Sequence, residues 1–105
     1  MTIEARRLRL KGEVSIFEAP ALKHAVTQTL MQERGLVLDL SEVTFVDSGG
    51  AAVIAHAVRM ARELGIPQSD VRLEGASRPI QRLLFITGLS QFFPATMPDG
   101  PDQIQ

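Results

Sequence analysis

Residues 36–65 constrain the fold of this 105-residue chain more than any other stretch. Residues 36–40 and 43–46 are apolar apart from Asp39 and Thr44, and they are rich in the residue types that favour a buried strand. A small polar and glycine cluster, residues 47–50, follows directly, and residues 51–65 form an alanine-rich run that favours helix. This order predicts a strand, a short link and then a helix that begins near Ser48.

Ser48 has two interpretations at that helix start. The free amides of a helix N-terminus carry about half a positive charge and favour an anion, so its hydroxyl is either a simple N-cap or a site of phosphate chemistry. Asp47 reads as a turn residue or as a partner of the helix dipole. Gly49 and Gly50 allow close backbone approach and leave the Ser48 hydroxyl sterically open.

The N-terminal segment alternates with the period of a half-buried strand. Within residues 2–13, Leu8 and Leu10 fall on one face, and Arg7, Arg9 and Lys11 fall on the other. The pattern fits either a hairpin or one continuous edge strand. The basic side chains are expected to form a solvated sheet edge.

Capping and breaking residues place the other elements. Ser15 with Glu18 reads as a capping box, and the helix is expected to run to about residue 33 and end at Gly35. Residues 41–42 read as a bend and residues 71–75 as a strand. Residues 77–79 are expected to open a third helix that closes at Gly88, and residues 89–93 to add a short last strand. The side chains expected on the buried sides of the three helices are Ala21, Leu22, Ala25, Val26, Thr29, Leu30, Ala51, Ile54, Ala55, Val58, Ala61, Leu64, Ile80, Leu83, Leu84 and Ile86.

The alternation of strands and helices predicts an α/β fold. We expect a small, mostly parallel sheet of four to five strands, with three to four helices packed on one or both faces. Residues 1–94 should form one domain. Residues 95–105 hold few apolar side chains, two prolines and two aspartates, and are expected to be a flexible C-terminal tail.

Composition excludes several kinds of site. The chain has no cysteine and only two histidines, so we expect no disulfide, no metal centre and no cofactor. The net charge of −1 gives no drive toward nucleic acid or an anionic membrane. No apolar run approaches 18 residues and no signal peptide is visible, so we expect a cytoplasmic protein without direct membrane insertion.

An enzymatic function is not expected. Neither histidine has the sequence context of a nucleophile elbow, and Gly49–Gly50 lacks the lysine and the length of a phosphate-binding loop. No catalytic residue is therefore predicted, and Ser48 is expected to be a substrate position. His56, Arg59 and Met60 are expected on the outer side of the helix after Ser48, either as solvated side chains or as partner contacts.

Four segments together resemble the STAS domain family. They are residues 12–14, residues 37–41, residues 45–50 and residues 77–89, and their order and spacing match that family over roughly residues 8–94. The chain is most similar to single-domain anti-sigma factor antagonists of the bacterial SpoIIAA type. It departs from the family pattern at Ser15, Gly49 and Ala51.

The resemblance implies a STAS fold and a role in partner switching. In that group the serine after an aspartate at the start of the second helix is phosphorylated by a partner that is both serine kinase and anti-sigma factor. Carried over, the phospho-acceptor is Ser48, beside Asp47. The unphosphorylated chain would bind the kinase, phosphorylation would release it, and a serine phosphatase would reset it. The implied partner surface comprises Asp47, Ser48, Gly49, His56, Arg59 and Met60.

Two other functions fit the same family. The first alternative is a STAS-domain regulatory subunit of an ABC-type lipid transporter, bound to its ATPase, which the departures at Gly49 and Ser15 keep open. The second is partner switching with an output other than transcription.

Overall fold

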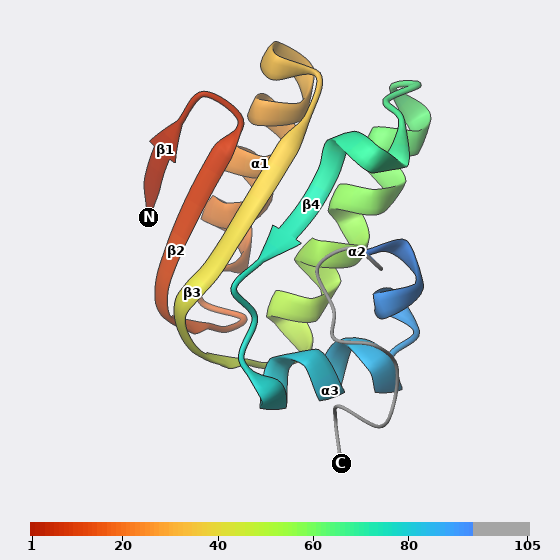
Figure 1. The fold of residues 1–105 in the computed structure, drawn as a ribbon. Coiled ribbons are helices and arrows are strands. Elements are labelled where there is room, and N and C mark those ends of the chain that lie inside the picture. The colour runs from red at the N-terminus through yellow and green to blue at the C-terminus, as the bar shows by residue number, and fades with distance from the viewer. Residues whose placement is uncertain (94–105) are drawn as a thin grey trace.

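The computed structural model describes residues 1–93 of the chain (Figure 1). Its strands are β1 (Thr2–Glu4), β2 (Arg7–Val14), β3 (Leu36–Val46) and β4 (Val71–Glu74). Its helices are α1 (Ala19–Glu33), α2 (Ser48–Glu63) and α3 (Arg78–Ile86), with short 3-10 segments at Gln68–Asp70 and Leu89–Phe92. The predicted tail, residues 95–105, lies outside the described residues, as does the last residue of the predicted domain.

The four strands form one sheet in the order β1-β2-β3-β4. β2, β3 and β4 are parallel, whereas β1 pairs antiparallel with β2, so the sheet is mixed. The two crossovers step in the same direction across the sheet, and right-handed crossovers then place both helices on one face. Figure 1 shows α1 and α2 side by side behind the sheet, with the other face uncovered. The predicted α/β fold with three helices is confirmed.

The N-terminal alternation belongs to a hairpin. Ala5 occupies the turn with a φ of 53°, and β1 becomes the edge strand. The prediction of a basic sheet edge was therefore wrong, because β2 is an interior strand. Arg7 and Arg9 lie on the uncovered face, where both form ion pairs with Asp39 of the neighbouring strand.

The core lies between the sheet and the two long helices. Its largest fully buried side chains come from β2, β3, β4, α1 and α3: Leu8, Val26, Leu30, Leu36, Leu38, Leu40, Leu73 and Leu84. The side chains between them on β2 and β4 face solvent, which is the period-two pattern of a sheet covered on one side.

The predicted bend at residues 41–42 does not occur. β3 runs unbroken through these residues and has 11 residues in all. The Asp39 side chain accepts hydrogen bonds from the Ser41 amide at 3.0 Å and from the Ser41 hydroxyl at 2.6 Å. The irregularity lies instead in the pairing with β2, whose register shifts twice. Polar residues in an extended segment were thus mistaken for a turn.

Several local predictions also need correction. Residues 89–92 form a 3-10 turn and not a strand, although Phe93 is buried against the core. Ile86, at the end of α3, is 73% exposed, and Ala21 is exposed as well, while Ala55, Leu64 and Leu83 are half-buried. The left-handed residue after α1 is Arg34 and not Gly35, with a φ of 54°.

Candidate functional site

Ser48 lies at the edge of the sheet where the parallel strands end. The chain leaves β3 at Val46, passes through Asp47 and enters α2 at Ser48. The C-terminal end of β2 and the first turn of α1 lie at the same edge, and α3 crosses beneath it (Figure 1). Ligand and partner sites of α/β proteins concentrate at this edge, because loops from several strands converge there.

Asp47 fixes the backbone around this position. Its Oδ1 accepts a hydrogen bond from the Gly50 amide at 3.1 Å, which makes Asp47 the N-cap of α2. Its Oδ2 accepts from the Ile16 amide at 3.2 Å, and its own amide donates to the Val14 carbonyl at 3.2 Å. One side chain therefore joins the start of α2 to the segment after β2.

These contacts also set the charge of Asp47. The Gly50 amide, and after it the Ile16 amide, stabilise the carboxylate and lower the pKa of Asp47 below its ordinary value. The side chain is ionised at neutral pH and faces the positive end of the α2 dipole.

Both glycines after Ser48 are needed for close packing. A Cβ on Gly50 would lie 2.5 Å from the Val14 carbonyl oxygen and 2.8 Å from Val46 Cγ1. A Cβ on Gly49 would lie 2.8 Å from Ile16 Cα. The start of α2 thus presses directly on the end of β2, and the prediction of close backbone approach is confirmed.

The Ser48 hydroxyl is free for chemistry. Ser48 is the first residue of α2 and is exposed, and its side chain forms no hydrogen bond to any residue within 1–93. Of the two interpretations of Ser48, the simple N-cap is excluded, because Asp47 holds that position. The structural role and the exposed hydroxyl therefore belong to two neighbouring residues.

The segment between β2 and α1 forms an ordered turn next to Asp47. The Ser15 hydroxyl and amide both donate to the Glu18 carboxylate, which gives the predicted Ser15–Glu18 pairing, although α1 itself begins at Ala19. The hydrogen bond from the Ser15 hydroxyl is the main cause of the lowered pKa of Glu18. This turn exposes Ile16 by 65% and Phe17 by 86%, so two apolar side chains project beside Asp47.

A groove of about 440 Å³ runs between α1 and the first half of α2. Its lining includes four small residues, Ala19, Pro20, Gly49 and Ala52, and three basic ones, Lys23, His56 and Arg59. Val53 completes the lining, and no acidic side chain contributes. Ser48 immediately precedes Gly49 and lies one helical turn before Ala52, at the end of this groove.

Of the two roles expected for His56, the solvated side chain is excluded. Its Nε2 lies 3.0 Å from Thr27 Oγ1 in a hydrogen bond between the two helices, and the residue is half-buried. Burial, and then the positive charges of Lys23 and Arg59, lower the pKa of His56. The imidazole is therefore mostly neutral at pH 7.

The structure brings most of the predicted surface residues together. Gly49, His56 and Arg59 line the groove, while Ser48 and Asp47 lie at its end. Met60 does not belong with them, since it is half-buried and packs against the core, contrary to its predicted outer position. The sequence pattern did not single out Lys23 or the exposed pair Ile16 and Phe17.

The described residues contain neither a metal site nor a membrane span. No group of three or more His, Asp or Glu side chains within 1–93 is placed to hold a metal ion. Over the same residues, no helix combines the length and the apolar character needed to cross a bilayer.

Comparisons with known proteins agree with this architecture. The family model described as "Mlab, STAS domain" matches residues 1–97. An anti-sigma-B factor antagonist of Listeria monocytogenes is 40% identical over 81 residues, which is 75% of this chain and 68% of that protein. The anti-sigma-B factor antagonist of Bacillus subtilis is 29% identical over 83 residues, covering 79% and 73% of the two chains.

Solved structures of SpoIIAA share the fold. The unphosphorylated form of this anti-sigma factor antagonist matches with a TM-score of 0.66 and 16% identity, over 98% of this chain and 88% of that one. The phosphorylated form of the Bacillus protein matches with a TM-score of 0.67 and 15% identity, over 98% and 90%. On the evidence of the family model and the curated relatives, this chain belongs to the STAS domain family.

Proposed function

We propose that this chain is an anti-sigma factor antagonist that works by partner switching. The unphosphorylated chain binds a serine kinase that is also an anti-sigma factor, and phosphorylation of Ser48 ends that binding. A serine phosphatase restores the binding form. The chain acts in the cytoplasm as a substrate and binding partner of the kinase, and it does not act as a catalyst.

The observation that carries this proposal is the exposed Ser48 hydroxyl on a fixed backbone. Asp47 supplies the helix cap, so Ser48 is free to be modified without loss of an internal hydrogen bond. A kinase needs an accessible hydroxyl in a defined position, and this arrangement provides both. The curated relatives named as anti-sigma-B factor antagonists support this function over that of a transporter subunit.

The electrostatics favour a switch in binding rather than in folding. A phosphoserine adds about −1.5 to −2 charges. At the first residue of α2 the helix dipole offsets part of this charge, by about 0.3–1 kcal/mol, although the Asp47 carboxylate opposes it. In a partner interface the same charge is desolvated or placed near acidic groups, which weakens binding by several kcal/mol.

The partner surface has an apolar side and a basic side around Ser48. Ile16 and Phe17 supply exposed apolar area of the kind that anchors interfaces. Lys23 and Arg59 supply positive charge along the groove. In this proposal, Asp47 and Gly49 hold the loop in shape, and His56 contributes through its place in the groove wall.

The test is a tagged pull-down from the native cell, with mass spectrometry of the partners and of the Ser48 peptide. The proposal predicts a serine kinase in the bound fraction and phosphate on Ser48 in the unbound fraction. Recovery of a transporter ATPase with unmodified Ser48 would contradict it. A Ser48→Ala variant is the matched control, since it should retain the kinase and carry no phosphate.

A further inference from the structure

The groove between α1 and α2 is lined by two cationic side chains, Lys23 and Arg59, and by no acidic one. Elsewhere, Arg6, Arg7, Arg9 and Arg72 pair with carboxylates of this chain. Lys23 and Arg59, by contrast, form no ion pair within residues 1–93, and both are exposed. Two uncommitted positive charges therefore border one concave surface.

No carboxylate of this chain neutralises that surface from within the groove. Glu18 lines a separate groove with Phe17 on the other side of the α1 start. Glu63 lies on α2 one turn beyond Arg59. Its charge raises the pKa of His56 slightly, whereas the charges of Lys23 and Arg59 lower it. The positive charge of the groove is thus available to a bound anion.

Half of the residues that line the groove have small side chains: Ala19, Pro20, Gly49 and Ala52. A peptide segment of a partner can therefore lie close to the backbone of α1 and α2, beside Lys23 and Arg59. An acidic segment suits the charge as well, since it places carboxylates next to two cations that form no ion pair within residues 1–93.

We propose that this groove binds an acidic segment of the partner that recognises Ser48. The inference rests on the proposed function and adds the chemistry of the partner. A phosphate on Ser48 would stand at the end of the groove, where its negative charge repels the nearest carboxylates of the partner.

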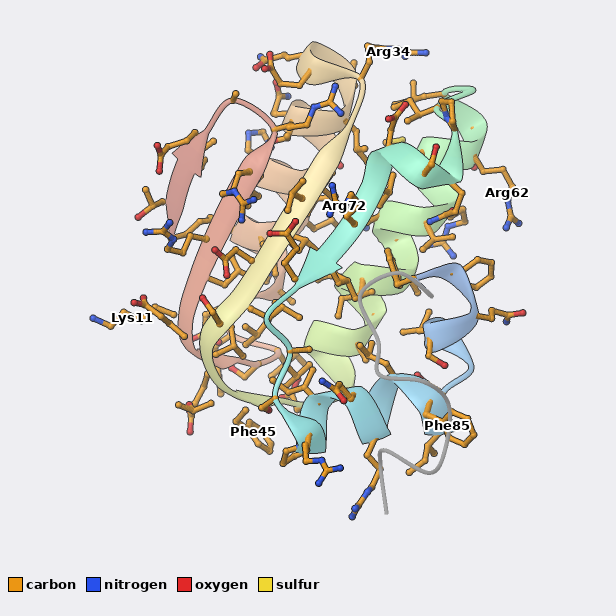
Figure 2. The ribbon with its side chains drawn as sticks, in the orientation of Figure 1. Lys11, Arg34, Phe45, Arg62, Arg72 and Phe85 are labelled. Carbon is orange, nitrogen blue, oxygen red and sulfur yellow. The ribbon has the colours of Figure 1, made fainter. Side chains whose placement is uncertain are left out.

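The first test measures the affinity of the recovered kinase for charge-reversed variants. Lys23→Glu and Arg59→Glu should each raise Kd about tenfold, and the double variant more, with a flatter dependence of log Kd on log salt. Arg72→Glu is the matched control, because Arg72 is exposed on β4 at the uncovered face of the sheet (Figure 2) and lies outside both grooves. Its Kd should change less than twofold.

A second measurement does not depend on the kinase. The ¹⁵N-labelled chain is titrated with hexaglutamate and with hexaglutamine at low salt. The inference predicts that hexaglutamate shifts the amide signals of Gly49, Ala52, His56 and Arg59, and that hexaglutamine does not. Equal effects of the two peptides, shifts confined to other residues, or equal effects of inorganic phosphate alone would overturn it.

The two proposals fail in different ways. If the wild-type chain neither binds a serine kinase nor carries phosphate on Ser48, the proposed function is wrong. If it does both, and the double charge reversal leaves Kd and its salt dependence unchanged, only the acidic segment is excluded.

Discussion

Asp47 and Ser48 show how two adjacent residues divide structure and chemistry. Asp47 makes the helix cap and the hydrogen bond to Ile16, whereas the Ser48 side chain makes no hydrogen bond to the described residues. Both residue types are good N-caps, and the sequence contains no signal that decides between them. Only the path of β3 into α2 shows that Asp47 is the cap.

Asp47→Ala should therefore destabilise the domain while Ser48→Ala should not. Loss of the cap and of the Ile16 bond is expected to lower Tm by about 5 °C in a domain of this length. Thermal unfolding followed by circular dichroism at pH 7 measures both variants. A larger loss for Ser48→Ala than for Asp47→Ala would contradict the assignment of the cap.

Gly50→Ala gives a second residue-level prediction, because two effects have opposite signs. Helix propensity alone would make the variant more stable by about 1 kcal/mol. The added Cβ, however, would lie 2.5 Å from the Val14 carbonyl, and such overpacking destabilises by about 1–3 kcal/mol or more. We expect a net loss of stability in urea unfolding, and a gain would show that α2 can move away from β2.

The central element is β3, whose only buried charge is Asp39. Asp39 is 8% exposed. On the uncovered face of the sheet, its carboxylate forms ion pairs with Arg7 and Arg9 and accepts a hydrogen bond from Ser41. Figure 2 shows the polar side chains on this face, with Arg72 labelled on β4. Hydrogen bonds from Ser41, and then the two arginine charges, lower the pKa of Asp39.

This arrangement predicts a pH dependence of stability that Asp39→Asn removes. Because the folded-state pKa is below the unfolded value, the stabilisation is fully present above about pH 4. It is lost as the pH falls through the folded-state pKa. At pH 7, Asp39→Asn should lower the free energy of unfolding by roughly 1–2 kcal/mol, the size of a lost charge-assisted hydrogen bond.

Urea unfolding of both proteins at pH 7, 4 and 2.5 checks this prediction. The difference between them should shrink as the pH falls. Glu42→Gln is the control on the same strand, since Glu42 is exposed and forms no ion pair within the described residues. A difference of the same size at every pH would contradict the role of the Asp39 charge.

Elements with a clear apolar period were predictable from the sequence, and a segment without one was not. The helices at residues 19–33 and 48–63 and the strand at 71–74 follow the expected periods closely. Residues 89–92 have apolar side chains only at their two ends, so their pattern does not distinguish a strand from a 3-10 turn. The hairpin was ambiguous because Ala5, and not a glycine, adopts the positive φ.

At the scale of the whole molecule, the one-sided packing of the helices decides what the site looks like. Because α1 and α2 share one face of the sheet, they also pack on each other and create the groove that joins Lys23 to Arg59. The sequence places these residues on separate helices and gives no sign that they meet. The same packing buries part of His56 and Met60, which a single-helix analysis left exposed.

The resemblance to STAS domains supplied Ser48 as the candidate site, and composition alone could not have done so. Its exposure and freedom from internal hydrogen bonds come from the structure. The central claim is that one phosphate at Ser48 changes binding and leaves the fold intact.

The most direct measurement compares the affinity of the recovered kinase for the unmodified and the Ser48-phosphorylated chain, alongside the Tm of each. The account predicts that phosphorylation raises Kd by about 100-fold or more while Tm changes by less than about 5 °C. An unchanged Kd, or a loss of binding that is accompanied by unfolding of the domain, would contradict it.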